Sequence, residues 1–251
     1  MKDASSSPYV LDCCVVTDIG MKRKQNQDSG TVRPDLSLFM VADGMGGHQG
    51  GETASRMCVE KVTEYLEKNK ATGDAEKRLE RALLSANLAI FELSEKEPKL
   101  RGMGTTATIL HISGDLAHIA QVGDSRAYYW NRQGIWQITR DHSLVQEKLR
   151  AGLITRDQVK VDEMKNVITR SVGYEATVKS DLYRFPIQKG DGFLICSDGL
   201  SGPVDDALMF EILEETNSSG VSLEDTARKL VQSANARGGD DNVTVVLVNV
   251  N

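Results

Sequence analysis

Four aspartates stand at the edges of four apolar, strand-like runs of the sequence: Asp43, Asp124, Asp198 and Asp241. A carboxylate beside a buried strand is costly unless something compensates its charge. Four sites of this kind suggest strand ends that converge on a shared cation, because clustered carboxylates repel one another without one. Oxygen ligands alone favour Mg²⁺ or Mn²⁺ over zinc. Taken singly, an Asp-Gly pair is equally well an ordinary turn.

Two loop-like segments add further polar residues. Arg23 and Asp28 stand five residues apart in a turn-like stretch, and the planar guanidinium group of Arg23 matches phosphate oxygens. The glycine-rich segment after Asp43 lacks the spacing of a Walker loop or a dinucleotide fingerprint. Its glycines let a backbone carbonyl such as that of Gly44 approach a metal. His48 is either a proton donor or a polar loop residue.

Other classes of phosphate or metal chemistry are disfavoured by residues that the sequence lacks. None of the four cysteines has an arginine six residues later, as a phosphate-binding cysteine nucleophile needs. No Asp-x-Asp pair offers an aspartyl nucleophile, and the four histidines are scattered, so a histidine-rich zinc site is not indicated. The residues present therefore favour a site in which carboxylates bind a hard cation.

Composition limits the partners and the compartment. The 251 residues carry a net charge of −6 and no strong basic run, which argues against nucleic acid and against a metal-dependent nuclease. No apolar run approaches the roughly 18 residues of a membrane span, so we expect no membrane association. The cysteines have no CxxC spacing, which indicates reduced thiols in a cytoplasmic protein. A monomer is the default, because no strong exposed apolar stripe is evident.

Hydrophobic periodicity predicts clustered strands instead of strict alternation with helices. Strands are expected over 9–17, 37–42, 105–112, 115–122, 126–130, 135–138, 181–187, 192–197 and 243–250. Helices are expected over 51–69, 74–95, 143–151, 204–215 and 222–236. The hairpin-like spacing favours paired antiparallel sheets with helices outside, an α+β fold. We also expect a flexible tail over 1–8, a single domain over 9–251, and a polar, mobile segment over 152–180.

Seven motifs follow one another along the chain: DIGMKRKQNQDSG, VADGMGGHQGGETAS, GMGTTAT, AQVGDSRAYYW, RDHSLVQ, LICSDGLSG and GGDDNVTVVLV. In this order they resemble the metal-dependent protein phosphatases of type 2C, specifically the compact bacterial Ser/Thr phosphatases. The match extends from about residue 9 to 250. The resemblance implies an α-β-β-α, four-layer fold, in which helix pairs flank a central antiparallel β-sandwich.

The same resemblance implies a binuclear Mn²⁺ or Mg²⁺ centre. By analogy Asp43 bridges both ions, and the Gly44 carbonyl binds one of them. The other implied metal residues are Asp198 and Asp241 on one ion, Asp28 on the other through water, and Asp124, which with Asp198 holds a weaker third ion.

Two further assignments concern the substrate. Arg23 matches the phosphate-binding arginine of the family, and residues 144–180 match its variable flap, which influences substrate choice. Some members place a histidine two residues after the first metal aspartate, where this chain has Met45. The identity of the general acid, His48 or water, is therefore left open.

The implied reaction is hydrolysis of phosphoserine and phosphothreonine by a hydroxide that bridges the two metals. The expected partners are phosphorylated proteins and a cognate bacterial Ser/Thr kinase whose action the enzyme opposes. Two alternatives stay open at this point. One is a phosphatase dedicated to a single phosphoserine signalling protein, and the other is a phosphoprotein-binding module with low turnover.

Overall fold

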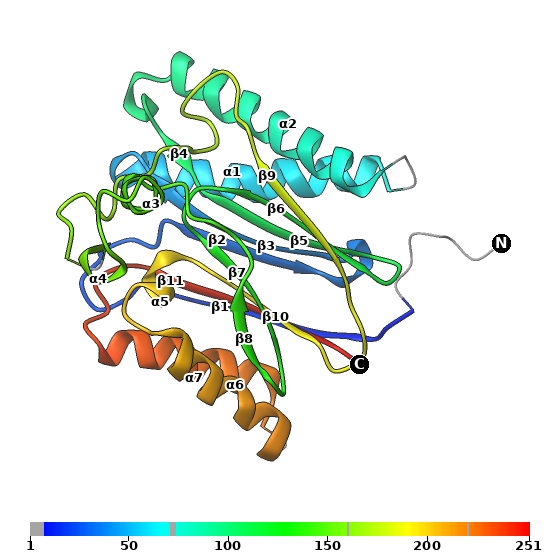
Figure 1. The fold of residues 1–251 in the computed structure, drawn as a ribbon. Coiled ribbons are helices and arrows are strands. Elements are labelled where there is room, and N and C mark those ends of the chain that lie inside the picture. The colour runs from blue at the N-terminus through cyan, green and yellow to red at the C-terminus, as the bar shows by residue number, and fades with distance from the viewer. Residues whose placement is uncertain (1–7, 71–73, 160, 220) are drawn as a thin grey trace.

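The computed structural model describes residues 8–70, 74–159, 161–219 and 221–251. In this part of the chain two β-sheets lie face to face and a helix pair covers the outer face of each (Figure 1). The four layers have the order α-β-β-α, so the predicted fold class is confirmed. Residues 1–7 of the expected N-terminal tail lie outside the described residues.

The first sheet has the strand order β1-β11-β10-β7-β8, and all neighbours are antiparallel. Its strands are β1 (Leu11–Asp18), β7 (Arg126–Asn131), β8 (Gly134–Gln137), β10 (Gly192–Cys196) and β11 (Val243–Val250). Although β11 comes last in the sequence, it lies inside the sheet, between β1 and β10. It pairs with the whole of β1, from Leu11 opposite Val250 to Asp18 opposite Val243.

The second sheet has the order β2-β3-β5-β6-β9, again with antiparallel neighbours, and β4 pairs with the end of β3. Its strands are β2 (Asp28–Arg33), β3 (Leu38–Met45), β4 (Gly104–Thr105), β5 (Ala107–Ser113), β6 (Leu116–Val122) and β9 (Asp181–Pro186). The register places Asp28 directly opposite Asp43. Strand pairing therefore brings two of the sequence-predicted site residues together.

Two long helices, α1 (Gly47–Lys68) and α2 (Ala75–Lys96), cover the second sheet, and α6 (Asp206–Ser219) and α7 (Leu223–Ala236) cover the first (Figure 1). Side chains cap two of these helices, since Asp74 accepts a hydrogen bond from the Glu76 N–H and Ser222 from the Asp225 N–H. The shorter helical pieces are α3 (Leu144–Arg150), α4 (Arg156–Val159), α5 (Asp198–Ser201) and the 3₁₀ turns Pro34–Leu36 and Pro98–Leu100.

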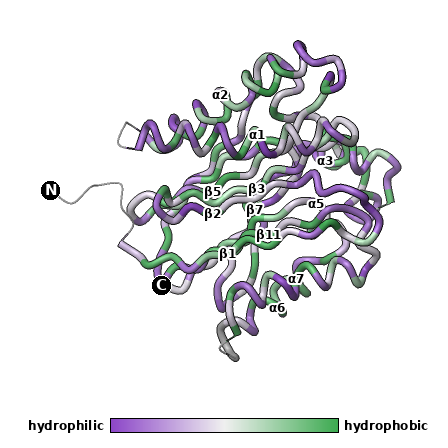
Figure 2. The backbone as a smooth tube through the Cα atoms, turned by 180° about the vertical axis from the view of Figure 1, so that it is seen from behind, coloured by the Kyte–Doolittle hydropathy of each residue, from purple (hydrophilic) through white to green (hydrophobic). Residues whose placement is uncertain are grey.

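Three layers of apolar side chains hold the four layers of backbone together. The middle one, between the sheets, contains Phe39, Leu110 and Phe193. Figure 2 shows hydrophobic residues concentrated along the strands, while the outer helices carry a mixture of both kinds. Strand side chains alternate between the two faces of a sheet. One face of each sheet therefore packs into the middle layer, and the other face packs against its helix pair. The two sheets are thereby fixed relative to each other, which matters for a site built from both.

The predicted elements agree with the structure to within four residues at each end. Three differences stand out. Strand β2 was not predicted, the strand expected over 105–112 is interrupted at Thr106, and α1 begins at Gly47 instead of residue 51. Within the described ranges, no helix is long and apolar enough to cross a membrane.

Candidate metal and phosphate site

The four strand-edge aspartates lie at one end of the β-sandwich. Asp43 stands near the end of β3, Asp124 in the turn after β6, Asp198 at the start of α5 just after β10, and Asp241 two residues before β11. All four line one cavity of about 580 Å³. The structure therefore brings together residues that are separated by up to 198 positions (241 − 43) in the sequence.

Asp28 adds a fifth carboxylate beneath the cavity. It lies opposite Asp43 in the β2–β3 pair and is only 9 % exposed. Its Oδ2 accepts a hydrogen bond from the Ser197 hydroxyl (2.7 Å), and the Ser197 Oγ accepts one from the Thr244 N–H (2.9 Å). Asp28 belongs to one sheet and its partners belong to the other, so this chain of hydrogen bonds joins the two sheets at the site.

The backbone around Asp43 is fixed by the threonines of the GMGTTAT motif. The Asp43 N–H donates to the Thr106 Oγ1 (2.9 Å), and the Asp43 carbonyl accepts from the Thr106 N–H (2.8 Å) and the Thr105 hydroxyl (2.9 Å). The next residue must be glycine, because a Cβ on Gly44 would meet the Gly51 carbonyl oxygen at 2.0 Å. The absence of a side chain at Gly44 therefore allows α1 to pack closely against the end of β3 beside Asp43, at a point that lines the cavity.

The loop that carries Arg23 is held against β11 by a single buried amide. The Asn242 Nδ2 donates to the carbonyls of Ile19 and Gln25, both at 2.9 Å, and its Oδ1 accepts from the Gln27 N–H at 2.8 Å. Asn242 is 4 % exposed. These three bonds span the loop on both sides of Arg23 and hold that side chain at the cavity wall.

Arg23 itself contacts a carboxylate of the group. Its Nη2 lies 2.6 Å from the Asp241 Oδ2, and its Nε donates to the Asp240 carbonyl (3.3 Å). The other oxygen of Asp241 accepts from the Asn242 N–H (2.8 Å). Both oxygens of Asp241 are thus engaged, and one of them is held by a side chain that can be displaced.

Burial and mutual repulsion raise the pKa values of several of these carboxyls. Burial raises the pKa of Asp28 to about 7, and the charges of Asp198 and Asp241 add to this effect. Burial also raises the pKa of Asp124 to about 7, again with repulsion from Asp198. The pKa of Asp43 lies well above its ordinary value, because of its burial and the surrounding carboxylates. Ionisation of such a carboxyl is unfavourable unless a cation compensates its charge.

Two observations test whether these residues fit a hard cation. Among the described residues, the buried Asp28 Oδ1 and Asp198 Oδ1 have no hydrogen-bond partner, so both lone-pair sets are available to a ligand. The site offers oxygen donors, which suit Mg²⁺ or Mn²⁺. Within the described part of the chain, no three acidic, histidine or cysteine side chains are grouped closely enough to hold one ion. The Arg23–Asp241 contact engages one carboxylate oxygen of this group.

The remaining wall of the cavity is basic and polar. Lys22 and Lys24 flank Arg23 in the sequence and line the cavity with it, and the lining also includes Asn166 and Ile168. His48 lies in the first turn of α1, next to the cavity-lining Gly47, but its side chain lies outside what the structure describes. The geometry therefore gives no role to His48.

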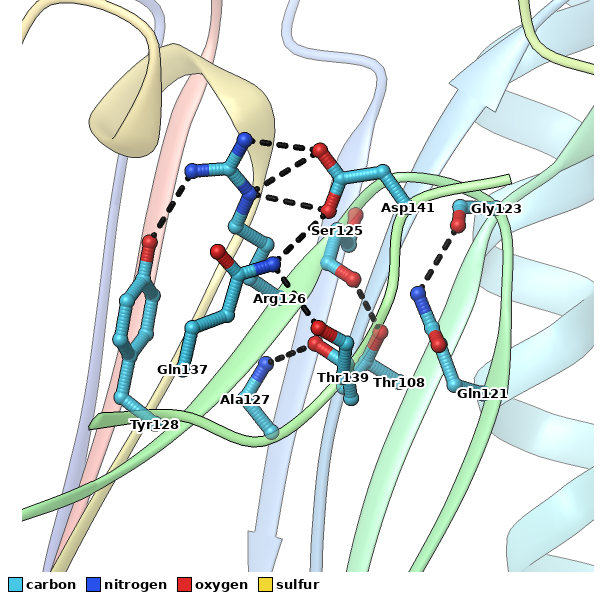
Figure 3. Close-up of polar contacts among 10 residues, drawn as sticks. All are labelled: Thr108, Gln121, Gly123, Ser125, Arg126, Ala127, Tyr128, Gln137, Thr139 and Asp141. Carbon is cyan, nitrogen blue, oxygen red and sulfur yellow. Dashed lines mark hydrogen bonds and ion pairs between the residues drawn. The ribbon is translucent and has the colours of Figure 1, made fainter. Parts of the chain in front are cut away.

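Sequence reasoning missed the residues that support this site from behind. Arg126 makes a bidentate contact with the buried Asp141, with its Nη2 at 2.7 Å from Oδ2 and its Nε at 3.0 Å from Oδ1 (Figure 3). His142, the next residue, is 3 % exposed and bonds to the turn of Asp124 through Gly123. The available signals were the AQVGDSRAYYW and RDHSLVQ motifs, in which these residues carried no assigned role.

Comparison with known proteins supplies the family. The model of the family described as Protein phosphatase 2C matches residues 21–240. The serine/threonine phosphatase stp of Listeria monocytogenes is 37 % identical over 238 residues, which cover 92 % of this chain and 93 % of the relative. The Mycobacterium tuberculosis serine/threonine protein phosphatase PstP is 36 % identical over 96 % of this chain and 45 % of its own length.

Solved structures agree. The catalytic domain of PstP in complex with two manganese ions superposes with a TM-score of 0.86, at 34 % identity over 96 % of this chain and 99 % of that one. The phosphatase Stp1 of Staphylococcus aureus gives a TM-score of 0.88, at 30 % identity over 96 % of both chains. The chain therefore belongs to the protein phosphatase 2C family, and it is a metal-dependent serine/threonine protein phosphatase.

Proposed function

We propose that this enzyme hydrolyses phosphoserine and phosphothreonine at the cavity described above, with two Mn²⁺ or Mg²⁺ ions held by its aspartates. Asp43 would serve both ions, with Asp198 and Asp241 on one of them and the Gly44 carbonyl and Asp28 on the other. Asp124 would help Asp198 to hold a weaker third ion. The observation that carries this assignment is the convergence of four carboxylates from two sheets around one cavity, with Asp28 paired opposite Asp43 and Arg23 at the cavity wall.

Each protein group has a distinct task in this proposal. When bound, the ions lower the pKa of water and offset charge on the phosphoryl oxygens. Asp241 would hold a cation with the oxygen that Arg23 contacts here, and the planar guanidinium of Arg23 would bind the phosphoryl group. The buried carboxylates keep the cations in place. No protein nucleophile is needed, and the leaving alkoxide takes its proton from water or from His48.

The testing experiment is phosphate release from a phosphothreonine peptide by metal-stripped protein, with and without added Mn²⁺. We expect release to need Mn²⁺, to exceed that from a phosphotyrosine peptide, and to fall by at least ~100-fold in Asp198→Ala. Asp240→Ala is the matched control, because Asp240 adjoins Asp241 but its exposed side chain pairs only with Lys22 among the described residues. Equal losses in both variants would argue against the assignment.

The biological setting is also part of the proposal. We infer that the enzyme acts as a cytoplasmic monomer on proteins phosphorylated by a cognate Ser/Thr kinase, and that residues 144–180 influence substrate choice. Support comes from the relatives, which are named as Ser/Thr phosphatases. Light scattering should give a mass near 27.5 kDa. Turnover of several unrelated phosphopeptides would exclude both a dedicated phosphatase and a low-turnover binding module.

A further inference from the structure

His142 is a buried imidazole that does not line the cavity, yet it makes polar contacts in two directions. Toward the cavity it binds Gly123 twice. The Gly123 N–H donates to the His142 Nδ1 (3.1 Å), and the His142 N–H donates to the Gly123 carbonyl (2.9 Å). Since Gly123 immediately precedes Asp124, this pair of bonds sets the point from which the Asp124 side chain extends.

The conformation and packing at position 123 require glycine. Its carbonyl accepts a second hydrogen bond from the Gln121 Nε2 (2.9 Å), as Figure 3 shows. Its φ is +102°, a conformation that favours glycine, and a Cβ there would meet the Thr106 Cγ2 at 2.5 Å. Both polar groups of Gly123 are therefore satisfied in this one arrangement, and His142 supplies two of the three bonds.

The far side of the imidazole faces an ion pair. The His142 Nε2 lies 3.3 Å from the Asp181 Oδ2, and the Arg170 Nη1 lies 2.8 Å from the Asp181 Oδ1. Because Nδ1 accepts a hydrogen bond, the neutral ring carries its proton on Nε2 and donates it to Asp181. Arg170 also lies 3.2 Å from Nε2, but two donors cannot bond to each other, so Asp181 is the shared acceptor. Burial lowers the pKa of His142, which agrees with a neutral ring.

This ion pair belongs to the base of residues 144–180. Arg170 lies near the end of that segment, and the Thr169 N–H donates to the His142 carbonyl (2.8 Å). Val172 then pairs with Thr105, and the Gly173 N–H donates to the Asn87 Oδ1 (2.7 Å). The His142 imidazole thus lies between the C-terminal end of this segment and the turn that carries Asp124.

We propose that His142 is a positioning residue that joins the Asp124 turn to the base of residues 144–180, through Gly123 on one side and Asp181 and Arg170 on the other. A change at Asp181 or Arg170 would then reach Asp124 through His142 and Gly123, whereas Asp43 and Asp28 are paired with each other in β2 and β3. The consequence for metal binding rests on the proposed role of Asp124. The structural coupling through His142 does not depend on that role.

Two substitutions at His142 divide its functions. His142→Asn keeps an acceptor near the position of Nδ1 but does not reach Asp181, and His142→Gln keeps a donor near Nε2 but leaves the Gly123 N–H without its acceptor. Asp181→Asn acts from the far end, without touching Gly123 or Asp124. Asp162→Asn is the control, because it removes the Lys148–Asp162 ion pair inside the same segment and leaves His142 untouched.

Hydrogen exchange of the metal-free protein is the first measurement. We expect the Gly123 and Asp124 amides to exchange about tenfold faster in His142→Gln and in Asp181→Asn, since a lost buried hydrogen bond has an effect of this size. His142→Asn should loosen the amides of Thr169 and Arg170 more than that of Gly123. Exchange at Gly123 should stay at its wild-type rate in Asp162→Asn.

Mn²⁺ titration of the full chain is the second measurement. Asp181→Asn should weaken the weakest Mn²⁺ step about tenfold and leave the tighter steps unchanged, because only Asp124 depends on the link. If Asp181→Asn lowers the melting temperature but leaves both Gly123 exchange and the weakest Mn²⁺ step at wild-type values, His142 is merely structural and the proposal is wrong. A protein that released no phosphate would refute the proposed function without altering the exchange result.

Discussion

The charge on Asp28 should destabilise the metal-free protein above neutral pH, and removing it should stabilise the fold. The ordinary pKa of this carboxyl is 3.8 and the folded structure raises it to about 7. The folded protein therefore holds a proton on Asp28 between about pH 4 and 7 that the unfolded chain releases. This contribution to stability is full below pH 4 and is lost as the pH rises through 7.

The size of the effect follows from the same values. The difference between 3.8 and about 7 corresponds to about 4 kcal/mol at pH 8, as an upper figure. Asp28→Asn removes the charge but keeps an acceptor for the Ser197 hydroxyl, and its amide can donate toward the neighbouring carboxylates. We expect this variant to gain about 2–3 kcal/mol over wild type at pH 8, and to match wild type near pH 4.

Urea unfolding in the presence of a chelator, at pH 4.5 and pH 8, measures the difference. The same substitution at Asp191 is the control. That residue is also buried, but its two oxygens accept from the Tyr129 hydroxyl (2.7 Å) and the Gln188 N–H (2.8 Å). An amide there places N–H against a donor, so Asp191→Asn should lose about 1–3 kcal/mol. If Asp28→Asn is no more stable than wild type at pH 8, the repulsion inferred for the site is wrong.

Three other predictions concern separate parts of the molecule. Asp43→Ala should lose at least ~100-fold in Mn²⁺-dependent turnover of a phosphothreonine peptide, and near wild-type turnover would remove Asp43 from the metal site. Asn242→Ala should cost about 2–3 kcal/mol in urea unfolding and raise the KM for phosphopeptide, because three bonds to the Arg23 loop are lost; an unchanged KM would contradict this role. Burial lowers the pKa of His111 to about 4, so protonating this one group should cost the fold about 3 kcal/mol as the pH falls from 6.5 to 4, against the gain from Asp28 over the same range. His111→Gln should therefore gain about 3 kcal/mol relative to wild type between pH 6.5 and pH 4 in urea unfolding, and an unchanged difference between the two proteins would contradict this role.

Much of the fold could be predicted because its strands and helices carry strong periodic signals. The valine-rich run 243–250 was predicted with the bounds that β11 has. Strand β2 was missed because its sequence DSGTVR holds a single large apolar residue and no alternation. It is a strand because β3 supplies its hydrogen bonds and because the sheets approach closely there: a Cβ on Gly30 would meet the Val15 Cγ2 at 2.9 Å. That approach is a tertiary fact with no local signal.

The candidate site divides in the same way. Its aspartates could be predicted because each follows or precedes an apolar run, which sequence shows directly. The position of Asp28 opposite Asp43 depends on strand register, and the clamp of Asn242 on the Arg23 loop depends on contacts across more than 200 residues. The early start of α1 has a similar cause. Glycines are poor helix formers, so the first helical turn, GHQGG, was not predicted. Glycine is required at position 51 because a Cβ there would meet the Gly44 carbonyl oxygen at 2.7 Å, and this tertiary contact has no local signal.

The interior position of β11 makes assembly of the enzyme an all-or-none event. In the first sheet β1 and β10 are both neighbours of β11, so neither can complete its pairing before β11 joins the sheet. Asp241 and Asn242 arrive with that strand, and they carry both a carboxylate of the site and the clamp on Arg23. A chain truncated before Asp241 would therefore leave the edges of β1 and β10 unpaired and would lack one carboxylate of the cavity and the clamp on the Arg23 loop.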